Sequence, residues 1–343
     1  MANERLPITV AGAGITGLWQ ALTLARRGHR VRLVEASAAP FAAAASSYAG
    51  AMLGPCCETE VYAPVVAELG LQALELWRAT FPGTAMNGTL VVAPSRDTHE
   101  IDHFARLTAG HERVDAAAVA RLEPDLAGRF ATGLFYPQEG HVEPHAAMRF
   151  LLDRALEAGV EAAFAAAWPP DGHGRDGGDG FVIDCRGLGA RAELAGLRGV
   201  RGERIVVRTR EIALSRPVRL LHPRHPLYVV PWPDGRFMIG ATVIESDDAG
   251  PVSVRSALEL LGAAYALHPA FAEAEILDAG AGVRPAFADN VPRIVVRGRT
   301  LHVNGLYRHG FLLAPALAVQ VARYLEGTPT DARVVSDPPA LTR

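Results

Sequence analysis

Residues 12–17 read Gly-Ala-Gly-Ile-Thr-Gly, a GxGxxG pattern, and the segments on both sides of it restrict its meaning. Pro7–Ala11 before it has the β-branched composition of a short strand, and Leu18–Arg27 after it has the apolar spacing of a helix. Arg30–Val34 then alternates like a second strand and is followed directly by Glu35. A strand, a glycine turn, a helix and a second strand ending in an acid predict a βαβ unit that binds a dinucleotide.

The three glycines of this pattern have different expected roles. Gly12 makes the tight turn, and Gly14 lets the backbone approach a pyrophosphate without a Cβ in the way. Gly17 lets the helix pack closely on the strand. Ile15 and Thr16 lie at the start of the helix, whose free N–H groups would receive the pyrophosphate.

The acid at the strand end leaves two cofactors open. Glu35 can accept hydrogen bonds from both hydroxyls of a ribose, and its charge disfavours a 2′-phosphate, which suits FAD and NAD alike. Asn304–Pro315 favours FAD, because a strand there runs into a glycine turn and then a helix. A helix start aimed at the flavin C2=O would stabilise the negative charge that builds up on reduction.

Hydrophobic periodicity predicts the remaining elements along the chain. Helices are expected at 61–81, 144–158, 252–267 and 311–325, and a further helix is expected within 114–126. Strands are expected at 88–93, 133–136, 160–167, 181–185, 204–208, 227–230, 236–241, 275–283, 294–296 and 301–304. The glycine-rich segment 169–180 is predicted to be a surface loop without a function.

These elements predict an α/β (mixed α+β) fold with two interleaved domains. We expect a Rossmann-like FAD-binding domain that is discontinuous in sequence, from residues 1–85, 144–198 and 286–343. An antiparallel or mixed sheet from residues 86–143 and 199–285 would form the substrate-binding domain.

Composition excludes several other classes of protein. The formal net charge of −3 argues against a dedicated nucleic-acid binder. Three cysteines are too few for a disulfide framework and favour a reducing compartment. We expect a soluble cytoplasmic protein, since no signal sequence and no apolar run of membrane-spanning length is evident. HExxH and CxxC patterns are missing from the sequence, so we predict no metal site.

Five segments together resemble the D-amino-acid oxidase superfamily, and within it the glycine oxidase branch that serves thiamine biosynthesis. They are GAGITG with Glu35, Tyr48–Leu53, Ile183–Gly189, Gly282–Pro285 and the closing GLYRHGFLLAP. The resemblance implies a two-domain flavoprotein with noncovalent FAD, in which the second domain covers the isoalloxazine ring and forms the substrate pocket. Cys56 and Cys57 are not assigned to covalent flavin attachment, because they match no attachment motif and read as small buried side chains.

The resemblance also assigns residues to the cofactor site. They are Gly12, Gly14, Ile15, Thr16, Gly17, Glu35, Ala36, Ser47, Gly50, Met52, Leu53, Val160, Cys185, Gly187, Arg308, His309, Gly310, Phe311 and Leu312. His309 is interpreted as structural rather than as a base.

Three residues are predicted to act on the substrate. Arg284 is the first candidate for binding a carboxylate, because a planar guanidinium matches two oxygens. Arg308 and Tyr228 match family positions near the flavin and the carboxylate. Trp232 and Val243 depart from the family pattern, since relatives more often carry a basic residue and a Met there, and this bears on substrate size.

The resemblance implies oxidative deamination of glycine or a similarly small amino acid. Hydride transfer from Cα to flavin N5 would give an imine, which hydrolyses to a 2-oxo acid and ammonia, while O₂ reoxidises the flavin to give H₂O₂. The alternatives are a sarcosine or D-amino-acid oxidase or dehydrogenase of the same superfamily, a non-catalytic flavin-binding partner subunit, and an NAD-linked enzyme. A homo-oligomer is possible.

Overall fold

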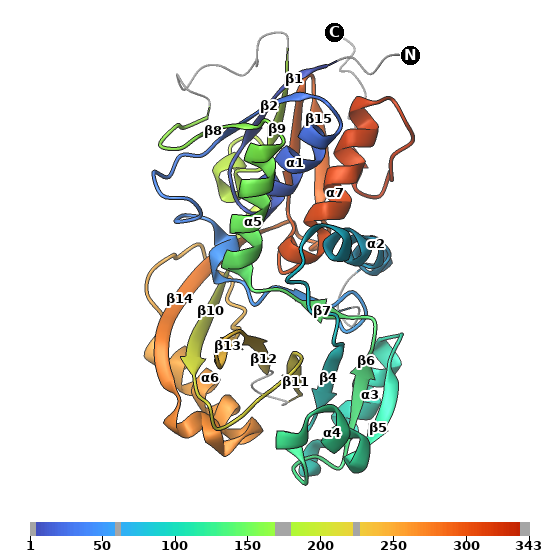
Figure 1. Ribbon diagram of the computed structural model, residues 1–343, viewed down its shortest axis with the longest axis vertical. Helices are drawn as coiled ribbons and strands as arrows, with labels where there is room; N and C mark the ends of the chain where they lie inside the picture. The colour runs from blue at the N-terminus through green and yellow to red at the C-terminus, as the bar shows by residue number, and fades with distance from the viewer. Residues whose placement is uncertain (1–4, 59–62, 169–179, 222–226, 337–343) are drawn as a thin grey trace.

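The computed structural model describes residues 5–58, 63–168, 180–221 and 227–336, which form two halves stacked along the long axis (Figure 1). The upper half contains a seven-stranded sheet in the order β17-β15-β16-β9-β1-β2-β8. Its strands are β1 (Pro7–Ala11), β2 (Arg30–Val34), β8 (Glu161–Ala163), β9 (Phe181–Asp184), β15 (Arg293–Arg297), β16 (Thr300–Asn304) and β17 (Val335–Ser336). Most neighbours run parallel, as a dinucleotide-binding sheet requires, whereas β15 and β16 are antiparallel.

Three helices cover the parallel sheet. They are α1 (Ile15–Arg26), α5 (Pro144–Glu157) and α7 (Gly310–Leu325). The first and the last lie side by side and bury almost every residue that faces the sheet, which makes this half the larger hydrophobic core (Figure 1).

The lower half contains an eight-stranded sheet in the order β14-β10-β13-β12-β11-β4-β6-β5. Its strands are β4 (Thr89–Val92), β5 (Glu112–Asp115), β6 (Thr132–Tyr136), β10 (Arg198–Arg208), β11 (Val218–Leu220), β12 (Leu227–Trp232), β13 (Arg236–Gly240) and β14 (Glu275–Ala286). All neighbours are antiparallel except β4 and β11. The helices α3 (His99–Leu107), α4 (Ala116–Leu122) and α6 (Val254–Leu267) pack against this sheet.

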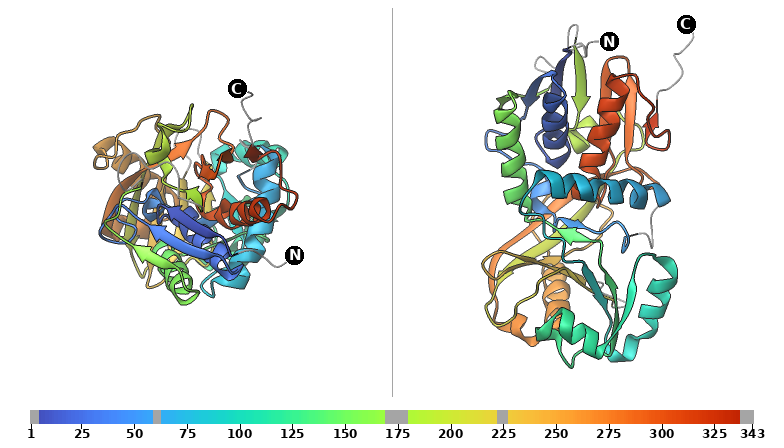
Figure 2. Two further views of the ribbon diagram at one scale, coloured as in Figure 1. Left: turned by 90° about the horizontal axis from the view of Figure 1, so that it is seen from above. Right: turned by 45° about the vertical axis from the view of Figure 1, so that its right-hand side comes forward.

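Helix α2 (Pro64–Thr80) crosses between the two halves, which Figure 2 shows most clearly from the side. Its Trp77 is fully buried and stacks on Phe311 with ring centroids 6.1 Å apart. The indole Nε1 also donates a hydrogen bond of 2.7 Å to the Phe311 carbonyl oxygen. This contact fixes α2 against the start of α7, and so against one wall of the site described below.

The predicted fold class is confirmed, and the predicted elements mostly occur where expected. The helix predicted within 114–126 is confirmed as Ala116–Leu122, and the short strand β5 directly precedes it. Asp115 separates the two elements by accepting a hydrogen bond of 2.8 Å from the Ala118 N–H at the helix start. Of the predicted loop 169–180, only Gly180 lies within the described residues.

Several short elements were not predicted, and one strand is longer than expected. Helix α3 and strand β11 had no prediction, and β10 begins at Arg198 rather than at position 204. The missing part of β10 is rich in Gly and Arg, which have low strand propensity. These residues lie in a sheet because they pair with β14, and Arg201 and Glu203 form a buried ion pair along the strand, with 2.6 Å between Nη2 and Oε1.

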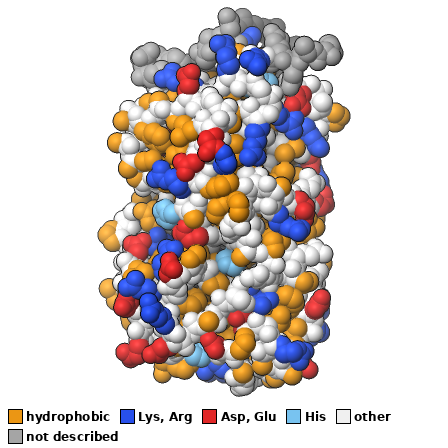
Figure 3. Space-filling model, in the orientation of Figure 1, with side chains coloured by type: hydrophobic (Ala, Val, Ile, Leu, Met, Phe, Trp, Pro, Cys, Tyr) orange, Lys and Arg blue, Asp and Glu red, His pale blue; other side chains and the backbone are white. Residues whose placement is uncertain are grey.

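The surface and the helices give two further observations. Basic and acidic side chains are interspersed over the face shown in Figure 3. In the described part of the chain, no helix combines the length and the apolar character needed to cross a bilayer. Within the same residues, no three His, Cys, Asp or Glu side chains come together in a way that could hold a metal ion.

Candidate active site

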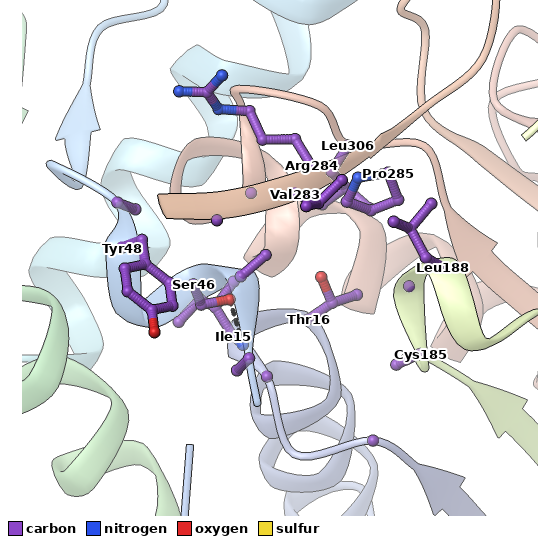
Figure 4. Close-up of a pocket in the computed structure, with 18 of the residues that line it drawn as sticks. Ile15, Thr16, Ser46, Tyr48, Cys185, Leu188, Val283, Arg284, Pro285 and Leu306 are labelled. Atoms are coloured by element: carbon purple, nitrogen blue, oxygen red, sulfur yellow. Dashed lines mark hydrogen bonds between the residues drawn. The ribbon is translucent and has the colours of Figure 1, made fainter. Parts of the chain in front are cut away.

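A cavity of about 760 Å³ lies where the two halves of the molecule meet. Its walls come from the loop after β1, the first turn of α1, the 3₁₀ turn Ala45–Tyr48, strand β14 and the turn before α7 (Figure 4). Seventeen of the residues predicted from sequence line it: Gly12, Gly14, Ile15, Thr16, Glu35, Ala36, Gly50, Met52, Cys185, Gly187, Tyr228, Arg284, Arg308, His309, Gly310, Phe311 and Leu312. Residues far apart in the sequence therefore form one elongated site.

The glycine loop occupies one end of this cavity. Gly12 has a φ of +97°, and a Cβ there would lie 2.7 Å from the carbonyl oxygen of Cys185. A Cβ on Gly17 would lie 1.8 Å from the carbonyl oxygen of Gly12, so both positions exclude a side chain. Gly14 differs, because a Cβ there would make only ordinary contacts, 3.5 Å from Ser46 Oγ and 3.8 Å from Ala44 Cβ, and it borders the open cavity. The loop therefore exposes its backbone to the space where a ligand would lie.

Glu35 connects this loop to the chain that follows β2. Its carboxylate accepts hydrogen bonds from the Ala13 N–H at 2.8 Å and from the Ser37 N–H at 2.9 Å, one on each oxygen. Each carboxylate oxygen can accept a second hydrogen bond, so Glu35 keeps the capacity to bind ribose hydroxyls. The two backbone contacts hold the carboxylate in the cavity wall.

Four predicted cofactor residues lie behind the wall rather than in it: Gly17, Ser47, Leu53 and Val160. Leu53 and Val160 are buried in the large core, and the Ser47 hydroxyl donates a hydrogen bond of 2.8 Å to the Phe41 carbonyl oxygen. The neighbouring Ser46 faces the site instead, where its Oγ accepts a hydrogen bond of 3.2 Å from the Ile15 N–H (Figure 4). The sequence pattern predicted the correct turn but the wrong serine.

Arginine side chains mark the other end of the cavity. Arg284 projects from β14, away from the first turn of α1, and its Nη1 donates a hydrogen bond of 3.1 Å to the Thr242 carbonyl oxygen (Figure 4). Its guanidinium lies directly over Gly202 of β10, where a Cβ would be 1.9 Å from Nη2. Tyr228 of β12 reaches the same space. Gly50 leaves room for the tyrosine ring, since a Cβ there would lie 3.0 Å from Tyr228 Cε2.

Arg308 and His309 come from the turn that begins α7. Arg308 Nη2 lies 3.4 Å from the carboxylate of Glu58, a residue that the sequence did not single out. His309 is 2% exposed, and burial is the main cause that lowers its pKa to about 4. The imidazole is therefore neutral at physiological pH.

Other residues that line the cavity were missed for identifiable reasons. Trp168, Gly202 and Asp247 carry no motif signal, and their positions depend on which strands and loops meet. For Glu58, the available signal was an acid shortly after the Tyr48–Leu53 segment that carried the family resemblance.

Neither of the two residues predicted to affect substrate size lines the cavity. Trp232 is buried in the lower half, with the Arg236 guanidinium 5.9 Å from its ring centroid. Val243 is 50% exposed. Trp232 lies on the same face of β12 as Tyr228 and packs behind the cavity wall with Met52 and Met238, whereas Val243 lies beyond the end of β13.

Of the two cysteines before Glu58, Cys56 is half-buried and Cys57 is buried. Cys57 is fully buried, and burial is the main cause that raises its pKa well above that of a free thiol. Burial likewise raises the pKa of Cys56 to about 11. Both side chains are therefore protonated at neutral pH, which fits the small buried role expected for them.

Comparison with known proteins covers nearly the whole chain. A family model (DAO) described as FAD dependent oxidoreductase matches residues 7–324. A thiamine biosynthesis oxidoreductase, ThiO, from Rhizobium etli is 54% identical over 320 residues, which are 93% of this chain and 96% of the relative. A glycine oxidase from Geobacillus kaustophilus is 27% identical, with 94% of each chain covered.

Solved structures show the same fold. A crystal structure of glycine oxidase from Geobacillus kaustophilus superposes with a TM-score of 0.79 and 24% identity, covering 95% of this chain and 97% of that one. The structure of L-α-glycerophosphate oxidase from Mycoplasma pneumoniae with FAD bound gives a TM-score of 0.77 at 20% identity, with 95% and 96% covered.

Proposed function

Since the chain belongs to the DAO family of FAD-dependent oxidoreductases, as its motifs predicted, we propose that it oxidises glycine, with the thiazole part of thiamine as the destination of the product. The main observation in support is one continuous cavity, which joins the glycine loop at one end to Arg284, Tyr228 and Arg308 at the other. The names of two relatives, a thiamine biosynthesis oxidoreductase and a glycine oxidase, support the choice of substrate.

The dinucleotide end of the cavity fits FAD. Gly14 borders open space, and the first N–H groups of α1 point toward it without intrahelical acceptors. Glu35 would hold a ribose, and the first N–H groups of α7, from Gly310 and Phe311, would lie along the flavin. We propose noncovalent binding, because the thiols of Cys56 and Cys57 lie outside the cavity wall.

The arginine end would orient the amino acid. Arg284 would bind the substrate carboxylate through two nitrogens, while the Thr242 carbonyl and the bare backbone of Gly202 fix the guanidinium plane. Tyr228 and Arg308 would hold the same carboxylate from the side. FAD, when bound, supplies the hydride acceptor. The protein therefore contributes mainly orientation of the Cα–H bond.

The overall reaction would convert glycine, O₂ and water into glyoxylate, ammonia and H₂O₂. The three cysteines are all free thiols, which supports the proposed location in a reducing cytoplasm. We also propose the predicted division into an FAD-binding domain (1–85, 144–198, 286–343) and a substrate domain (86–143, 199–285), because the strands of the two sheets alternate along the chain in the same way.

Anaerobic reduction of the flavin tests the proposal. We expect glycine to bleach the absorption near 450 nm more efficiently than D-alanine or D-phenylalanine, and Arg284→Ala to lower the specificity constant for glycine by roughly 10²–10⁴ with FAD retained. Oxidation of a simple amine without a carboxylate should change little in that variant. Faster bleaching by the D-amino acids would contradict the choice of glycine, and equal losses on glycine and the amine would contradict the role of Arg284.

A further inference from the structure

Glu58 is an acid in the arginine end of the cavity that the proposed reaction does not use. Its side chain is 11% exposed, and one carboxylate oxygen lies 3.4 Å from Arg219 Nη1 and 3.4 Å from Arg308 Nη2. Arg219 also donates a hydrogen bond of 3.0 Å to the Cys57 carbonyl oxygen. Two guanidinium groups from different elements therefore converge on one carboxylate beside the proposed substrate site.

The charges around Glu58 keep it ionised. Burial by itself would raise the pKa of this carboxyl, but the guanidinium groups of Arg308 and Arg219 outweigh burial and lower it, with smaller contributions from His309 and Arg284. Glu58 therefore carries a negative charge at neutral pH, inside the same cavity wall that contains Arg308 and Arg284.

The backbone that carries Glu58 is held in place from below. The buried carboxylate of Glu139 accepts hydrogen bonds from the Cys56 N–H at 2.8 Å and the Cys57 N–H at 2.7 Å. Glu139 itself is fully buried beneath this turn. The turn that contains Glu58 is therefore held in place, which keeps the Glu58 carboxylate between Arg219 and Arg308.

Two convergent guanidinium groups are a site for an anion, and here the anion is part of the protein. We propose that Glu58 is a specificity-determining residue, which occupies the Arg219–Arg308 site and so excludes amino acids that carry a second negative charge. This inference rests on the proposed function, because the first carboxylate must bind at Arg284. A monocarboxylate is accepted, whereas a second anionic group would meet the charge of Glu58.

A matched pair of ligands tests this in the FAD-bound enzyme. Malonate has two carboxylates, and its monoamide malonamate has the same shape with one. Both dissociation constants can be measured from the perturbation of the visible flavin spectrum, without turnover. We expect malonate to bind the wild type about tenfold or more weakly than malonamate, and Glu58→Gln to reduce or reverse that ratio by about tenfold or more.

Two control variants distinguish an effect of the Glu58 charge from a general effect of replacing an acidic residue. Glu58→Asp keeps the charge and should keep the ratio near that of the wild type, and Glu275→Gln removes an acid from a surface ion pair with Arg208 and should leave the ratio unchanged. Equal ratios in the wild type and Glu58→Gln would overturn the proposal. If Glu58→Gln does not retain FAD, the test relies on the wild type alone. Malonate that binds the wild type as tightly as malonamate would also overturn the proposal. Failure to oxidise glycine would instead reject the proposed function, and the binding ratio would still be measured.

Discussion

Gly202→Ala tests whether the position of the Arg284 guanidinium controls activity. Gly202 pairs with Gly282 in the β10–β14 ladder, and Arg284 lies two residues further along β14. The Arg284 side chain therefore crosses the backbone of Gly202, where a Cβ would lie 1.9 Å from Nη2 and 2.1 Å from Cζ. Since unstrained contacts between such atoms are about 3.5 Å, the guanidinium would have to move by roughly 1.5 Å.

A displacement of that size has a measurable expected cost. Misplacing a group that positions the substrate by about 1 Å costs on the order of 100-fold in rate, or about 2.7 kcal/mol in transition-state binding. We therefore expect Gly202→Ala to lower kcat/KM for glycine by roughly 100-fold, while the ratio of flavin to protein stays that of the wild type. The assay is steady-state formation of H₂O₂ together with the absorbance near 450 nm.

Gly262→Ala provides the matched control, because nothing lies within 4 Å of a Cβ at that position in α6. It should leave kcat/KM unchanged and stabilise the helix by about 0.5–1 kcal/mol. The reasoning would be refuted if Gly202→Ala kept its FAD and more than about one third of the wild-type kcat/KM, since Arg284 could then not depend on this position.

Three other variants address separate parts of the site. Gly14→Val should purify largely without FAD, since a branched Cβ would enter the cavity, and a stoichiometric yellow protein would argue against the assigned loop. Arg284→Lys should recover only part of the activity lost in Arg284→Ala in the same oxidase assay, because an ammonium cannot bind two oxygens in one plane. Burial would raise the pKa of Asp184, but hydrogen bonds and charge from His302 and Arg186 lower it to about 2. The ionised carboxylate therefore stabilises the folded state above about pH 4, and this stabilisation is lost as the pH falls toward 2. Asp184→Asn should therefore lower the free energy of unfolding at pH 7 by about 2 kcal/mol, and this free energy should fall less between about pH 4 and pH 2 than in the wild type. Denaturant titrations at several pH values measure both effects, and a free energy of unfolding equal to that of the wild type at every pH would contradict the prediction.

The dinucleotide end of the cavity could be predicted from the sequence because the residues that form it lie close together in the chain. The turn at Gly12, the close packing at Gly17 and the acid at Glu35 all occur within one βαβ unit. The error at Ser47 arose where periodicity carries no information, since a 3₁₀ turn decides which of two adjacent serines faces the site. A propensity argument likewise failed at Arg198–Glu203, where pairing with β14 and not side-chain type keeps the chain in a strand.

The arginine end could be predicted only through the family resemblance, because its members come from separate elements and support one another across the fold. Arg284 depends on the missing side chain of Gly202, and Arg308 is paired with Glu58. Glu58 in turn depends on backbone hydrogen bonds to Glu139. None of these supports has a sequence spacing that could indicate its role. It follows that changes at residues remote from the substrate, such as Glu139, should alter selectivity by moving a charge, while leaving the glycine loop and its cofactor in place.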